Sequence, residues 1–133
     1  MSSKKIILNM IGGGFQHDIC SQALNTNKYV EWDKNEHKAD ISIHIDSGIC
    51  TIPVDPSKTN FGWIAEASVI IPDVLRVIIS NLDYFKSKFK CIFTYDPVLL
   101  NLDSNFFKYV QPPVVSWVRN KKVYDKSKLI SFI

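Results

Sequence analysis

Arginine, cysteine and long apolar runs are scarce in this sequence of 133 residues, and each shortage excludes a class of protein. Only Arg76 and Arg119 carry the guanidinium that binds phosphate with two parallel hydrogen bonds, although the chain has 16 basic residues and a net charge of +3. The lysines are spread along the chain, and the local clusters at 86–90 and 121–122 are typical of a solvated surface. No nucleic-acid partner is therefore expected.

The three cysteines, Cys20, Cys50 and Cys91, are odd in number and widely spaced. This pattern indicates neither a disulfide framework nor a zinc finger, and it predicts a reduced, cytoplasmic protein. No stretch approaches the roughly 18 apolar residues of a membrane span, and the apolar run 6–11 is too short for the core of a signal peptide. No membrane span is expected.

What the sequence does contain is an alternation of strand-like and helix-like segments in a chain that is 46% hydrophobic. This alternation predicts an α/β, Rossmann-like fold: one domain spanning 1–133, with a mainly parallel sheet and helices on both faces. Strands are expected at 5–11, 29–32, 39–46, 61–65, 91–94 and 107–110, and helices at 17–25, 72–89 and 97–102.

Two segments have a clear periodicity. In 39–46 the isoleucines share one face of a strand, while Ser42, His44 and Asp46 share the other, which suggests a partly exposed, hydrogen-bonded His44. In 72–89 apolar residues recur at three- and four-residue steps, as in a helix with one face on a sheet. This apolar stripe consists of Val74, Leu75, Ile78, Ile79, Leu82, Phe85 and Phe89.

Parallel sheets bind ligands at the carboxyl ends of their strands, which directs attention to the loops 12–17, 46–48, 66–68 and 95–97. The first holds Gly12, Gly13, Gly14 and His17, and a glycine-rich turn before a helix can hold a phosphate or a sugar hydroxyl. The dinucleotide fingerprint G-x-G-x-x-G is incomplete here, because His17 replaces its third glycine. The alternative is a tight strand-to-helix turn that needs positive φ.

Glu66 is the candidate catalytic residue, because a carboxylate at the exit of an apolar strand can act as a general base in the cleft. A purely structural, hydrogen-bonded Glu66 is the alternative. Trp63 and Trp117 are either core residues or platforms on which a sugar ring stacks. The pairs His17–Cys20 and His44–Asp46 lack a metal-specific spacing, so neither a metal nor another cofactor is expected.

The second half of the chain also resembles a known family. The motifs are a strand ending in Glu66 before a long helix, a strand ending in Thr-x-Asp at 94–96, and Lys-x-Lys-Leu-Ile-Ser-x-Ile at 126–133. They lie in the stretches "FGWIAEASVIIPDV", "FKCIFTYDPVLLNL", "FKYVQPPVVSWV" and "VYDKSKLISFI". Over Asn60 to Ile133 the sequence is similar to the N-terminal half of the fucosyltransferase-like glycosyltransferases of bacteria, phages and marine metagenomes.

This resemblance implies the acceptor-side domain of a two-domain enzyme of the GT-B type. Such an enzyme transfers a sugar, such as fucose, from a nucleoside-diphosphate donor to a glycan hydroxyl, with Glu66 as the base and Gly13, Gly14, His17, Trp63 and Trp117 near substrate. The donor site would lie in a second domain beyond Ile133, so the chain is expected to be a truncated frame without activity of its own. Two alternatives are a free-standing module that binds nucleotide or phosphate at Gly12–Gly14, and an assembly domain that forms homo-oligomers through its C-terminal strand.

Overall fold

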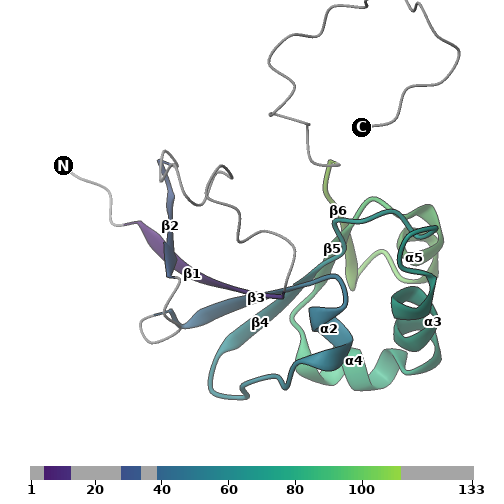
Figure 1. The fold of residues 1–133 in the computed structure, drawn as a ribbon, viewed down its shortest axis with the longest axis horizontal. Helices are drawn as coiled ribbons and strands as arrows, with labels where there is room; N and C mark the ends of the chain where they lie inside the picture. Colours follow the sequence, from purple (N-terminus) through teal and green to yellow (C-terminus); the bar gives the residue numbers. More distant parts are fainter. Residues whose placement is uncertain (1–4, 13–27, 34–38, 112–133) are drawn as a thin grey trace, which may run out of the picture.

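The computed structural model describes residues 5–12, 28–33 and 39–111, and within them it forms one six-stranded sheet in which every neighbouring pair of strands is parallel (Figure 1). The sheet order is β2-β1-β3-β4-β5-β6. The strands are β1 (Ile6–Ile11), β2 (Val30–Asp33), β3 (Ile41–Ile45), β4 (Thr59–Trp63), β5 (Ile92–Thr94) and β6 (Phe107–Tyr109). The α/β, Rossmann-like fold predicted from the alternating pattern is confirmed.

The described helices lie together on one side of this sheet (Figure 1). They are α2 (Gly48–Thr51), α3 (Pro72–Ser80), α4 (Leu82–Lys88) and α5 (Pro97–Leu102). Their apolar side chains form the hydrophobic core with Ile92 and Phe107 of the strands and with Ile64, directly after β4, all of which are at most 1% exposed. The helix expected at 17–25, on the segment between β1 and β2, lies outside the described residues. None of the helices in the described ranges is long and apolar enough to cross a bilayer.

The polar side of β3 faces the helices, contrary to the sequence-based expectation. Ser42 and His44 are 0% exposed, and the ring of His44 packs edge-on against Phe89, with 5.2 Å between the ring centroids. The prediction of a partly exposed His44 is therefore wrong. Alternation in the sequence shows which side chains share a face of a strand, but not whether that face is exposed. Because β3 is a central strand of a parallel sheet, its polar face is covered as well.

The segment 72–89 forms two helices instead of the single helix expected. Asn81 separates α3 from α4 with φ −129° and ψ 36°, and its side-chain amide donates a hydrogen bond to the carbonyl of Val77 at 2.9 Å. The same carbonyl also accepts the backbone N–H of Asn81 at 3.1 Å, so the side chain and the backbone of Asn81 share one acceptor. Ile79, expected in the buried stripe, lies within α3 and is 40% exposed.

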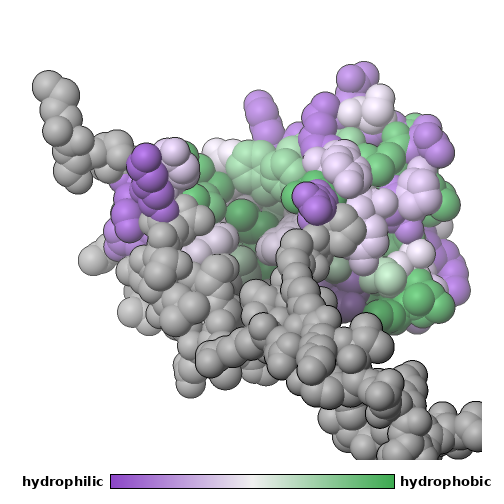
Figure 2. Space-filling view, turned by 90° about the horizontal axis from the view of Figure 1, so that it is seen from above, coloured by the Kyte–Doolittle hydropathy of each residue, from purple (hydrophilic) through white to green (hydrophobic). Residues whose placement is uncertain are grey.

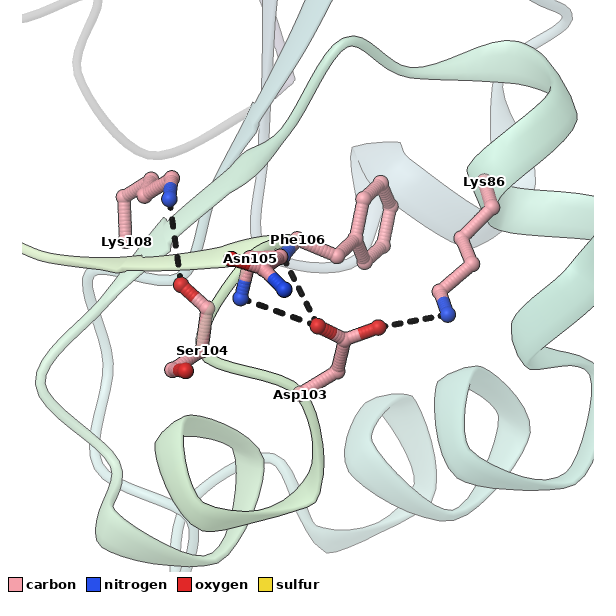
Figure 3. Close-up of polar contacts among 6 residues, drawn as sticks. All are labelled: Lys86, Asp103, Ser104, Asn105, Phe106 and Lys108. Atoms are coloured by element: carbon pink, nitrogen blue, oxygen red, sulfur yellow. Dashed lines mark hydrogen bonds and ion pairs between the residues drawn. The ribbon is translucent and has the colours of Figure 1, made fainter.

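Asp103 connects the loop after α5 to α4 (Figure 3). One carboxylate oxygen lies 2.5 Å from the Lys86 ammonium, and the other accepts hydrogen bonds from the backbone N–H groups of Asn105 and Phe106 at 2.9 and 3.1 Å. The hydrogen bond from Lys86 is the largest of the causes that lower the pKa of Asp103. This contact holds the chain in position as it enters β6.

The strand order contains a topological switch point between β1 and β3. The chain places β2 on one side of β1, and then returns to add β3 on the other side and continues outward to β6. In open parallel sheets with the order 2-1-3-4-5, the carboxyl ends of the strands at this point border the usual ligand crevice.

Candidate functional site

The carboxyl ends of β1 and β3 approach each other through backbone atoms. Gly12 has φ +123°, and a Cβ added there would lie 2.8 Å from the carbonyl oxygen of Ile45. A Cβ added at Gly48 would lie 3.1 Å from the Cα of Gly12. Only glycines allow the two strand ends to come this close, so the first residue of the glycine-rich turn is required by the packing at the switch point.

Asp46 links the end of β3 to the end of β4. It adopts φ +47°, a conformation that aspartate tolerates better than most side chains. Its backbone N–H donates to the carbonyl of Trp63 at 3.0 Å, and its Oδ1 accepts the backbone N–H groups of Ala65 and Glu66 at 2.8 and 3.1 Å. These bonds fix the backbone of Glu66 at the rim of the sheet.

The side chain of Glu66 is exposed, and its carboxylate has no hydrogen-bond partner among the residues that the structure describes. Tyr95, which follows β5, lies beside it and donates its hydroxyl to the carbonyl of Ala65 at 3.3 Å. Burial raises the pKa of the Tyr95 phenol, and the negative charges of Glu66, Asp46 and Asp96 raise it further. A carboxylate without a described hydrogen-bond partner and a protonated phenol therefore lie together at the carboxyl ends of β4 and β5.

Asp96 is the third acidic residue near Tyr95, after Asp46 and Glu66, and its role is structural. It is 6% exposed, and its Oδ1 accepts the backbone N–H groups of Val98 at 2.9 Å and Leu99 at 3.3 Å. It is thus the N-cap of α5, with Pro97 as the first helical residue. Of the three carboxylates around Tyr95, Glu66 is the one that accepts no hydrogen bond from the described residues.

The structure brings together only some of the residues expected at a site. Trp63 is the last residue of β4, half-buried beside Phe93 of β5, and Glu66 follows it by three residues. Four expected site residues lie outside the described residues: Gly13, Gly14, His17 and Trp117. No group of metal-binding side chains occurs in the described part of the chain.

Sequence reasoning missed Asp46 and Tyr95 as residues of this edge, although it marked both loops. The available signal was their place directly after an apolar strand, which puts each at the same edge as Glu66 once the sheet is parallel. The contact from Asp46 to Ala65 spans 19 residues, and no local pattern predicts a bond at that separation.

Exposed apolar side chains accompany the carboxylates at the strand ends. Val69 and Ile70, just after Glu66, are 85% and 64% exposed, and Tyr109 at the end of β6 is 68% exposed. Figure 2, which views the molecule from above, shows apolar side chains in green among hydrophilic ones in purple. The face seen in Figure 2 thus mixes hydrophilic residues with apolar ones.

Comparisons of the chain with protein-family models, with curated proteins and with solved structures give no match.

Proposed function

We propose that this chain is the acceptor-side domain of a cytoplasmic sugar transferase, in which Glu66 accepts the proton of the attacking glycan hydroxyl. The observation that carries the proposal is the exposed carboxylate of Glu66, without a hydrogen-bond partner among the described residues, at the carboxyl end of β4. Asp46 holds its backbone in place. This is the position at which parallel sheets present catalytic side chains.

The charge of the edge favours a sugar over a phosphate. Asp46, Glu66 and Asp96 all act on the same phenol, so their negative charges are concentrated in one place. Carboxylates accept hydrogen bonds from hydroxyl groups and repel phosphate. The exposed apolar side chains, with the half-buried ring of Trp63, offer area for the C–H face of a sugar ring.

In the proposed reaction, a glycan hydroxyl donates a hydrogen bond to the Glu66 carboxylate. As its oxygen bonds to the anomeric carbon of the donor, the proton passes to Glu66, and the bond from that carbon to the diphosphate breaks. The nucleoside diphosphate leaves with the electron pair. Cationic groups that stabilise this leaving group are assigned to a donor domain, since the described edge is acidic. The free thiols of Cys50 and Cys91 are in keeping with a reducing cytoplasm.

Saturation-transfer NMR of the full chain with galactose, N-acetylglucosamine and lactose tests the proposal. We expect weak binding of at least one sugar, and a loss of about tenfold or more in affinity on Glu66→Gln, because a charged hydrogen-bond acceptor is lost. Asp83→Asn, which removes another exposed carboxylate, on α4, is the matched control and should leave binding unchanged. No binding of any sugar, or equal binding by Glu66→Gln, would contradict the proposal.

A second candidate is a module that binds a nucleotide or phosphate at the Gly12–Gly14 turn. It is favoured by the positive φ of Gly12 at the switch point between β1 and β3. Calorimetry with GDP separates the two candidates. Tight GDP binding that is abolished by Gly14→Val supports the module, whereas an acceptor-side domain binds GDP weakly or not at all.

A further inference from the structure

The backbone changes its hydrogen-bond partners where it leaves the sheet after β4. The N–H of Ile64 still donates to a strand carbonyl, that of Phe93 on β5, at 2.8 Å. Ala65 is 7% exposed, so its backbone N–H and C=O also need partners inside the protein. Both find them on side chains: the N–H donates to Asp46 and the C=O accepts from Tyr95.

The C=O of Ala65 and the N–H of Glu66 belong to one peptide group, which is bonded at both ends. Its N–H donates to Asp46 Oδ1 at 3.1 Å, and its C=O accepts the hydroxyl of Tyr95 at 3.3 Å. Asp46 follows β3 and Tyr95 follows β5, which are the two neighbours of β4 in the sheet. The peptide group is therefore held from both sides by the ends of the adjacent strands.

The geometry of a peptide group couples these two hydrogen bonds. The group is planar and rigid, with its N–H and C=O on opposite sides of the chain. A rotation of the plane moves both groups together, so it disturbs the bond to Asp46 and the bond to Tyr95 at once. Each side chain thus keeps the peptide group in the orientation that the other needs.

Tyr95 is suited to its part of this arrangement. Burial raises the pKa of its phenol, and the nearby carboxylates raise it further, so the hydroxyl keeps the proton that it donates. Its neighbour Asp96 caps α5, which fixes the backbone next to Tyr95. At 3.3 Å the bond is long for a hydroxyl donor, so it is the weaker of the two that hold the peptide group.

We propose that Tyr95 is a positioning residue for Glu66, acting together with Asp46 through the peptide group between Ala65 and Glu66. Its hydroxyl fixes the point at which the Glu66 side chain leaves the sheet. The Glu66 carboxylate accepts no hydrogen bond from the described residues, so its position depends on its backbone. The positioning role rests on the proposed function, in which this carboxylate contacts a sugar, whereas the coupling of the two hydrogen bonds does not.

Amide hydrogen exchange of the full chain, measured by NMR at neutral pH, tests the coupling without any ligand. Tyr95→Phe removes the hydroxyl and keeps the ring. The N–H of Glu66 should then exchange about threefold faster, the effect of losing one weak hydrogen bond, although Tyr95 does not bond to that N–H. The N–H of Ile64 should keep its rate. Tyr84→Phe, at an exposed tyrosine on α4, is the matched control and should change neither rate.

Sugar binding tests the positioning role in a second measurement. The probe is whichever of galactose, N-acetylglucosamine and lactose the unmodified chain binds. Tyr95→Phe should weaken its binding about threefold. The same substitution made in Glu66→Gln should cause no further loss, because Tyr95 acts through the Glu66 carboxylate. An equal loss in both backgrounds would mean that Tyr95 contacts the sugar itself, which would overturn the positioning role.

The exchange rates separate this inference from the proposed function. An unchanged rate at Glu66 in Tyr95→Phe would show that the two hydrogen bonds are independent, and faster exchange at both Glu66 and Ile64 would show a general loosening of the strand end. Either result overturns the coupling. Faster exchange at Glu66 alone, with no sugar bound by the unmodified chain, would contradict the proposed function and the positioning role but would establish the coupling.

Discussion

At the scale of single residues, the candidate site depends on backbone positions that few side chains tolerate. Gly12 and Asp46 both have positive φ, and they follow the two strands that border the switch point. Positive φ costs glycine little, whereas at a non-glycine residue such as Asp46 it persists only where the surrounding structure holds it, often at binding sites. Here Asp46 is held by its hydrogen bonds to the end of β4.

Gly12→Ala is expected to lower the free energy of unfolding by about 2 kcal/mol or more, because an alanine would be strained at φ +123° and its Cβ would lie 2.8 Å from a backbone oxygen. Urea denaturation measures this change. Ser47→Ala is the control, because Ser47 is exposed and its side chain does not cap α2. A change below about 0.5 kcal/mol for Gly12→Ala would contradict the expectation.

At the scale of elements, the short helix α5 depends on its first residues. Its six residues are too few for helix propensity alone to stabilise it. Asp96 caps its N-terminus, and Leu99, which is 0% exposed, anchors it in the core. The same cap holds the loop that contains Tyr95.

Asp96→Ala is therefore expected to cost about 1 kcal/mol of stability, the usual effect of losing an N-cap side chain. Asp96→Asn should cost much less, because its amide oxygen still accepts from Val98 and Leu99. Thermal denaturation of the two variants side by side distinguishes them. Equal destabilisation by both would show that the charge of Asp96 matters more than its cap.

At the scale of the whole molecule, the buried His44 makes stability depend on pH. Its pKa in the folded state lies below the ordinary value of 6.5, chiefly because of burial. Below about pH 6.5 the unfolded chain therefore binds a proton at this residue more readily than the folded chain does. Stability is fully retained above this pH and is lost as the pH falls toward the folded pKa.

Urea denaturation between pH 7.5 and pH 5.5 should show a falling free energy of unfolding, by at most about 1.4 kcal/mol per pH unit for this one proton. The slope should be smaller in His44→Gln, which cannot titrate, whatever the absolute stability of that variant. A slope that His44→Gln leaves unchanged would assign the pH dependence to other groups.

Local patterns in the sequence were enough to predict the class of fold and the edge of the sheet that carries the candidate site. Apolar runs indicated the strands, since both faces of a central parallel strand are covered. The bounds predicted for the helix 97–102 agree with α5, because Asp96 and Pro97 form a local start signal. The loop after each strand of a parallel sheet lies at one edge, so the position of Glu66 followed from the alternation alone.

Tertiary packing sets the strand order, the burial of Ser42 and His44, and the contact of Asp46 with the end of β4. Secondary-structure propensity and hydrophobic periodicity report only on residues close together in the sequence. Burial depends on which elements pack against a face, and a hydrogen bond across 19 residues depends on which strands become neighbours. Packing between elements therefore determines whether a polar face of this sheet is buried, and a local sequence pattern cannot predict it.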